Sequence, residues 1–289
     1  MAGELRLKHS LPEPDPRIDH TRHKSRARCP VVSAPETVPS IAGNPMESQS
    51  FELFGTSHLA TLGVISAVAL VVPLTVRRLA ADQARNIAYL LAALLLGQEA
   101  IDLWRQIDAD NLSPAALLPL HLCTLAVYLT AWTLVTRSYR TYEIVYFWGL
   151  GGTIQALLTP DLTARFPDPI YLLFFAGHGL VIVGVMHLTI AFRLRPHAAS
   201  IARVAAITAA VTGIIFVINL WLDTNFLYLM AKPAQPSLLD WFGPWPWYLI
   251  GLVIVGLASL FVWYLPFLLL DLWRRRRAGL PMPPDDRQG

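Results

Sequence analysis

Long apolar stretches alternate with short polar connections along most of this 289-residue chain. A helix needs about 20 mostly apolar residues to cross the hydrocarbon core of a bilayer. Seven segments meet that requirement: Ser57–Val76, Arg85–Trp104, Pro114–Thr136, Tyr142–Leu158, Ile170–Phe192, Ile201–Leu222 and Trp245–Trp273. The pattern predicts an all-α integral membrane protein, folded as a bundle of seven transmembrane helices.

The basic residues indicate how this bundle is oriented. Short cytoplasmic connections carry an excess of Arg and Lys. The first, third and fifth connections and the C-terminal end hold most of the arginines, including Arg77, Arg78, Arg137, Arg140, Arg193, Arg195 and Arg274–Arg277. The second, fourth and sixth connections are more acidic. We therefore expect the N-terminus outside and the C-terminus in the cytoplasm, and a multi-pass protein of the bacterial plasma membrane.

Composition supports a membrane protein and excludes an ordinary soluble enzyme. Hydrophobic residues make up 54% of the chain and charged residues only 15%, against about a quarter charged in soluble domains. The net charge of +3 does not point to nucleic acid, because the arginines flank apolar segments and form no basic stripe. Two cysteines, Cys29 and Cys123, provide neither a disulfide framework nor a CxxC metal motif.

The N-terminal segment does not fit the orientation scheme. Residues 1–50 form a polar, Pro-rich and basic tail that we expect to be disordered, although the pattern puts it outside. One hypothesis is that the natural translation start is Met46. The predicted organisation is then a tail over 1–50, a seven-helix domain over 51–274 and a basic, Pro-rich cytoplasmic tail over 275–289.

Several ionisable and amide side chains fall inside the predicted helices. Such groups are costly in a bilayer, so each is a candidate functional residue. The candidates are Glu99, Asp102, His121, Cys123, His178 and Asn219, with Gln98 beside them. Glu143 and His187 belong to the inner half, where we expect Glu143 to pair with Arg140.

Depth estimates bring the candidates to one side of the membrane. At a rise of about 1.5 Å per residue, Cys123 lies about 13 Å and His178 about 12 Å from the outer ends of their helices. Glu99, Asp102 and Asn219 fall in the same outer half. His121 and Cys123 point about 200° apart on their helix and cannot form a dyad, so any base for Cys123 must come from another helix.

These residues allow several interpretations. A lone cysteine in an apolar helix is usually a packing residue, and a buried histidine often has a structural partner. His121, His178, Glu99 and Asp102 also offer enough donors for a catalytic zinc in a membrane lipid hydrolase. A non-enzymatic membrane receptor or transporter is a third possibility, although no duplicated halves are visible.

Four sequence runs resemble a known family. The runs 118–137, 143–162, 174–189 and 225–248 contain HLC, LTPDL, GHG and PWPWY. In this order they resemble the YwaF-like integral membrane family of bacteria, over about residues 51–274. That family is similar to animal transmembrane acyltransferases that move acyl chains between phospholipids to make polyunsaturated ether lipids.

The resemblance implies a phospholipid acyltransferase or acyl hydrolase. Cys123 would be the nucleophile and His178 its base, and the reaction would pass through an acyl-thioester. Asn219, His121 or Gln155 would donate to the oxyanion, and Asp102 or Glu99 would hold the tautomer of His178. The expected partners are membrane phospholipids and lysophospholipids, and no cofactor or metal is required.

Overall fold

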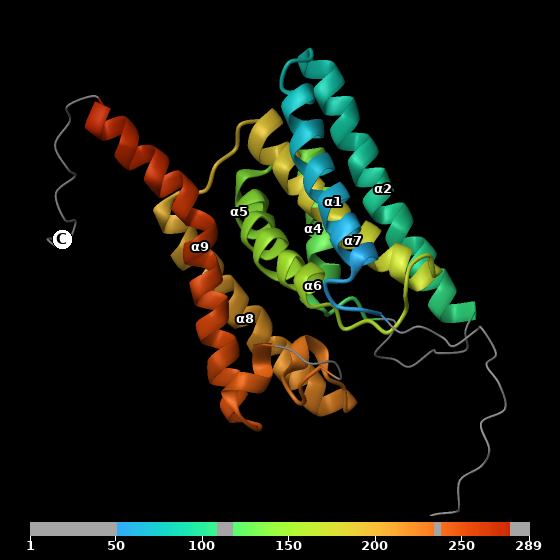
Figure 1. Ribbon diagram of the computed structural model, residues 1–289. Helices are drawn as coiled ribbons and strands as arrows, with labels where there is room; N and C mark the ends of the chain where they lie inside the picture. The colour runs from blue at the N-terminus through green and yellow to red at the C-terminus, as the bar shows by residue number, and fades with distance from the viewer. Residues whose placement is uncertain (1–50, 109–117, 234–237, 278–289) are drawn as a thin grey trace, which may run out of the picture. The chain divides into compact units, whose positions relative to one another are not determined.

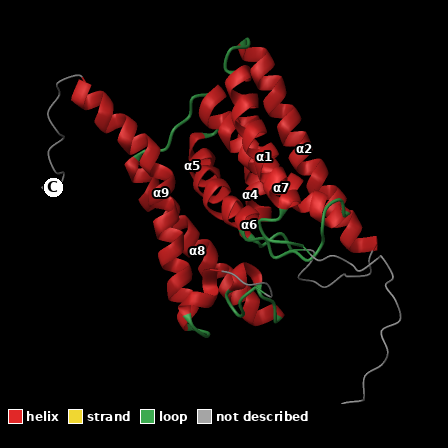
Figure 2. Cartoon of the chain, in the orientation of Figure 1, coloured by secondary structure: helices red, strands yellow, loops and turns green. Residues whose placement is uncertain are grey.

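The computed structural model describes residues 51–108, 118–233 and 238–277, and all regular structure in these ranges is helical (Figure 2). Five of the described helices are long and apolar enough to cross a membrane: α1 (Thr56–Val76), α2 (Ala81–Asp108), α7 (Pro169–Met186, continued to Ala191 by the π-helix η2), α8 (Ala198–Leu222) and α9 (Trp247–Arg277). The chain is therefore an all-α, multi-pass membrane protein. The N-terminal tail over 1–50 and most of the predicted C-terminal tail lie outside the described residues.

The two remaining predicted spans are helical but shorter or interrupted. The segment predicted as Pro114–Thr136 contains α4 (Leu122–Thr136), whose 15 residues cover only about 22 Å at 1.5 Å per residue. The segment predicted as Tyr142–Leu158 consists of α5 (Tyr139–Trp148), the π-helix η1 (Gly149–Thr153) and α6 (Ile154–Leu158). Three glycines in η1, Gly149, Gly151 and Gly152, weaken α-helical preference where the hydrogen-bond pattern changes.

The late start of α4 corrects the prediction that His121 lies inside a helix. Residues 118–121 are not helical, and His121 is the extended residue that precedes the first turn, with φ −71° and ψ 141°. Pro119 has no backbone N–H and disfavours a helical conformation in the residue before it. Cys123 consequently lies in the first turn of α4, not two turns inside the helix.

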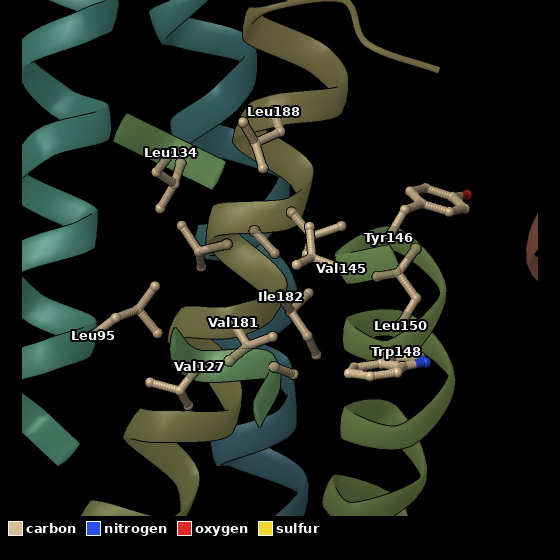
Figure 3. Close-up of a cluster of buried hydrophobic side chains, with 14 of the residues drawn as sticks. Leu95, Val127, Leu134, Val145, Tyr146, Trp148, Leu150, Val181, Ile182 and Leu188 are labelled. Carbon is tan, nitrogen blue, oxygen red and sulfur yellow. The ribbon is translucent and has the colours of Figure 1, made fainter. Parts of the chain in front are cut away.

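The core consists of buried side chains from α2, α4, α5 and α7, helices whose arrangement Figure 1 shows. Figure 3 draws part of this core. Its members include Leu95 of α2, Leu134 of α4, Tyr146 of α5 and Val181 of α7. Half of the apolar window of α7 is buried, against 11% for α8 and for α9. The fold therefore has a central helix, α7, while α8 and α9 leave most of their apolar surface uncovered by protein.

The start of α7 is set by its sequence. The Asp168 carboxylate accepts a hydrogen bond from the backbone N–H of Ile170 at 2.7 Å, and Pro169 occupies the first helical position. Both features are common at helix starts, because the N–H groups of the first turn have no partner within the helix. A side-chain oxygen can accept a hydrogen bond from one of them, and proline has no N–H that would be left unpaired. This cap fixes where the helix that carries His178 begins.

Glu143 on α5 is paired differently from the prediction. Its buried carboxylate accepts hydrogen bonds from Ser200 and Arg203 of α8, whereas the sequence suggested Arg140. Arg140 is exposed and Glu143 is buried. The ion pair therefore connects α5 to α8 instead of linking two residues of α5.

Candidate functional site

A cavity of about 500 Å³ lies between α2, α4, α7 and η1. Five of the six residues predicted for the site line it: Glu99, Asp102, His121, Cys123 and His178. Gln98 and Asp161 also line it. The structure thus brings together, in one cavity, side chains that the sequence separates by up to 79 positions, as Glu99 and His178 are.

His178 is held by its own helix. Its Nδ1 lies 2.7 Å from the carbonyl oxygen of Phe174, so this nitrogen carries the proton and donates it. The ring also packs on the Phe174 ring, with centroids 4.2 Å apart. Nε2 is therefore the nitrogen with a free lone pair, which is the atom a general base uses.

The Phe174 carbonyl performs the role that the sequence gave to a carboxylate. Asp102 accepts from Arg105 at 3.0 Å and from Gln106 at 2.8 Å, all within α2. The Glu99 carboxylate is half-buried and makes no hydrogen bond or ion pair with the residues that the structure describes. Neither carboxylate therefore orients His178, although both contribute negative charge to the cavity.

Cys123 faces the cavity from the first turn of α4. It is partly buried and is not part of a disulfide.

Glycines let helices approach closely beside the cavity: a Cβ on Gly177 of α7 would lie 2.7 Å from the Gln98 amide oxygen. The flanking glycines of His178 thus serve close packing, at Gly177 against Gln98 and at Gly179 against Ile65.

His121 lines the cavity, and it contacts Tyr228, which is not among the lining residues. The exposed His121 ring contacts the rings of Phe226 and Tyr228, with centroids 5.2 and 6.3 Å away. The Tyr228 hydroxyl donates to Asp161 at 3.2 Å. Burial, with the negative charge of Asp161, raises the pKa of Tyr228 to about 12, so this hydroxyl stays protonated and remains a donor.

Asn219 is the one predicted site residue that the structure places elsewhere. It is fully buried and does not line the cavity. Its amide donates to the carbonyl of Phe226, and its amide oxygen accepts from Thr224 and from the Phe226 N–H, all at 2.9 Å. Asn219 therefore closes the loop after α8, where Asp223 takes a left-handed conformation.

Thr153 is a cavity residue that sequence reasoning missed. It belongs to η1, is 1% exposed, and its hydroxyl has no hydrogen-bond partner among the described residues. A threonine in an apolar helix gives no signal by itself, since threonines usually bond to their own helix. Its place in the cavity follows from how η1 packs on α4 and α7.

The zinc hypothesis needs three or more donors close together. Within the described part of the chain, no group of three His, Cys, Asp or Glu side chains lies close enough to hold a metal ion. His121 and His178 both line the cavity but come from different elements, the residue before α4 and α7.

Comparisons with known proteins identify the family. The family model described as the TMEM164 family matches residues 53–264. The chain belongs to the TMEM164 family. An uncharacterized protein of Treponema pallidum (strain Nichols) is 27% identical to this TMEM164 family member over 224 residues, which cover 75% of this chain and 90% of the relative. No solved structure matches the chain.

The match corrects the resemblance read from sequence motifs. It confirms a membrane-protein family over nearly the whole predicted helical domain, but as the TMEM164 family and not under the YwaF-like name. The tail over 1–50 lies outside the matched region. The family description states no activity, so function must be argued from the cavity.

Proposed function

We propose that this TMEM164 family member is a phospholipid acyltransferase or acyl hydrolase of the bacterial cytoplasmic membrane, working through a thioester on Cys123. The observation that carries the proposal is that Cys123 and His178, from different helices, line one cavity, and that the Phe174 carbonyl leaves Nε2 of His178 free. A thiol in an apolar site needs such a base, because only the thiolate attacks well.

The cavity also suits a lipid ester. Apolar side chains such as Val127, Leu173 and Val181 line it together with the polar groups. The outer surfaces of the surrounding helices carry large exposed apolar residues, among them Leu94, Leu96 and Leu172. A cavity with both polar and apolar lining residues suits a molecule that carries a polar head and an ester beside its acyl chains.

The reaction begins when Nε2 of His178 takes the proton of the Cys123 thiol. The thiolate attacks an ester carbonyl of a phospholipid, and the tetrahedral intermediate collapses with cleavage of the bond to the glycerol oxygen. The imidazolium returns its proton to that oxygen, which releases a lysophospholipid and leaves the acyl chain on Cys123. A lysophospholipid hydroxyl then accepts the chain in a transferase, or water accepts it in a hydrolase.

We further propose that α4 and the α5–η1–α6 segment complete seven crossings, with the N-terminus outside. The contacts at the two ends of the bundle support this. At one end, Phe51 bonds to Thr163 and Tyr228 to Asp161. At the other, Tyr142 bonds to Leu194, so alternate connections gather at opposite ends.

The test is the intact mass of the full-length protein in phospholipid nanodiscs. We expect a fatty-acyl mass increment that hydroxylamine removes. Cys123→Ala should lack it, His178→Gln should form it at least about 100-fold more slowly, and Cys29→Ala, which removes the other cysteine, should retain it. Labelled lysophospholipid added afterwards distinguishes transfer from hydrolysis.

Two results would overturn the proposal. The first is an unmodified wild-type mass with every phospholipid class supplied. The second is an increment that persists in Cys123→Ala, which would place the acyl chain on another residue.

A further inference from the structure

The hydroxyl of Thr153 is buried in the wall of the cavity without a partner. The residue is 1% exposed, and Oγ1 makes no hydrogen bond to the described residues. An unpaired buried hydroxyl costs about 1–3 kcal/mol relative to a bonded one. A ligand that accepts a hydrogen bond from this hydroxyl would recover that cost.

Other threonines in the helices make a hydrogen bond that Thr153 lacks. The hydroxyls of Thr61, Thr133 and Thr189 donate to the backbone carbonyl four residues earlier, at 2.8, 2.6 and 2.8 Å. This bond is the usual way for a helical threonine to satisfy its hydroxyl. Thr153 makes no such bond among the described residues, so its O–H is not committed to the backbone of its own helix.

The position of Thr153 relative to Cys123 follows from the packing of η1 on α4. A Cβ on Gly152 would lie 3.4 Å from Cδ2 of Leu122. These two residues precede Thr153 and Cys123 directly, so the two elements meet at this point. Thr153, Cys123 and His178 all line the same cavity, and π-helical turns such as η1 often occur at functional sites.

Two of the three donors expected from the sequence are engaged elsewhere. The amide of Asn219 donates to Phe226, and that of Gln155 donates to Thr159 at 3.1 Å. Neither residue lines the cavity. The two amides proposed for the oxyanion are therefore not in the cavity. His121, the third expected donor, lines the cavity, and so does Thr153.

We infer that Thr153 donates a hydrogen bond to the oxyanion formed when Cys123 attacks an ester carbonyl. This inference rests on the proposed function. The carbon–sulfur bond forms, the carbonyl π electrons move to oxygen, and the Thr153 O–H stabilises that charge without transferring its proton. When the charge returns, the glycerol C–O bond breaks and the imidazolium of His178 protonates the leaving oxygen.

The test compares acylation rates of Cys123 in single-turnover mass spectrometry of the full chain in phosphatidylcholine nanodiscs. Thr153→Val keeps the shape and removes the hydroxyl, so acylation should slow about 100-fold, as for loss of one oxyanion donor. Thr153→Ser restores the hydroxyl and should stay within a few fold of wild type.

Two controls separate this role from a structural one. Thr130→Val removes another buried, unpaired hydroxyl that does not line the cavity, and it should leave the acylation rate unchanged. Alkylation of Cys123 by iodoacetamide forms no oxyanion, so its rate should be the same in Thr153→Val and wild type. The thermal midpoint of Thr153→Val should not fall, because no hydrogen bond is lost.

The outcomes distinguish the two proposals. Wild-type acylation together with a wild-type rate in Thr153→Val overturns the role of Thr153 alone. Equal losses in Thr153→Val and Thr153→Ser, or slowed alkylation by iodoacetamide, also overturn it and indicate a packing role. A wild-type protein that forms no acyl-enzyme overturns the proposed function, and the role of Thr153 with it.

Discussion

Three histidines in the membrane helices differ in how many ring nitrogens the protein uses. His58 uses both: Nδ1 accepts from the N–H of Phe54 at 3.0 Å, and Nε2 donates to the carbonyl of Leu157 at 2.8 Å. His187 bonds through Nε2 to Ala84, and Nδ1 is buried without a partner. His178 has one nitrogen bonded and one available in the cavity, which suits it best as a base.

His58 should be a stabilising residue. His58→Phe removes the partners of the Phe54 N–H and the Leu157 carbonyl, and two unsatisfied backbone groups should lower the free energy of unfolding by about 2–4 kcal/mol. Reversible unfolding in SDS, followed by circular dichroism, measures the loss. His121→Phe is the control, since this ring is exposed, and it should change stability by less than about 0.5 kcal/mol. Equal effects of the two substitutions would contradict the assignment.

Residue types and spacing were sufficient to pick out several side chains that line the cavity, whereas their catalytic roles stay predictions. Ionisable groups in apolar helices are rare enough that Glu99, Asp102, Cys123 and His178 stood out, and the cavity unites them. Asn219 stood out for the same reason but serves a loop, because the sequence does not show the turn of the chain after α8. Thr153 was missed, because only packing reveals that its hydroxyl has no partner.

At the scale of helices, α8 and α9 join the rest of the bundle through a few polar ties. Tyr146 of α5 donates to the carbonyl of Trp263 on α9 at 2.8 Å. Arg195, in the connection before α8, makes two hydrogen bonds to Asp271 of α9. Asp271 lies near the cytoplasmic end predicted for α9, so the Arg195–Asp271 pair fixes α9 at that end.

A double-mutant cycle measures the coupling free energy between Arg195 and Asp271. Arg195→Gln and Asp271→Asn should show a coupling of about 1 kcal/mol, because the pair is two-thirds shielded and doubly bonded. The control cycle uses Asp82 and Arg85, neighbours on α2 whose side chains are 77% and 42% exposed, and its coupling should be below about 0.5 kcal/mol. A coupling for Arg195–Asp271 no larger than that of the control would remove its role in holding α9.

Helix existence was easier to predict from the sequence than helix limits. All seven apolar segments contain helix, because a long run of apolar residues has no other way to satisfy its backbone in a bilayer. Two helix limits differ from the prediction. Because of Pro119, α4 begins only at Leu122, and α9 continues past Trp273 through four arginines to Arg277. The π-helical turns η1 and η2 could not be predicted from the spacing of apolar residues in the sequence.

For the whole molecule, the contacts between connections show which of them lie at the same end of the bundle. Arg137 lies over the ring of Phe192, and the Tyr139 hydroxyl donates to the carbonyl of Arg195. The third and fifth connections thus meet each other and the basic end of α9. The connection over 159–168 meets the segment after α8 at the other end.

Cysteine labelling tests the predicted orientation in a background without Cys29 and Cys123. In intact spheroplasts, a membrane-impermeant maleimide should label Thr163→Cys and not Arg78→Cys, both of which are exposed positions. Inside-out vesicles should give the reverse. Reversed labelling would invert the orientation, and labelling of both positions from one side would contradict the number of crossings between them.

The ion pair between α5 and α8 also sets an order of assembly. Glu143 is synthesised 57 residues before Ser200 and 60 before Arg203, the two side chains that bond its buried carboxylate. When α5 leaves the ribosome, this charge has neither partner, and an unpaired carboxylate is costly in a bilayer. The resting position of α5 is therefore reached only after α8 has been made, so the last third of the chain completes the insertion of its middle.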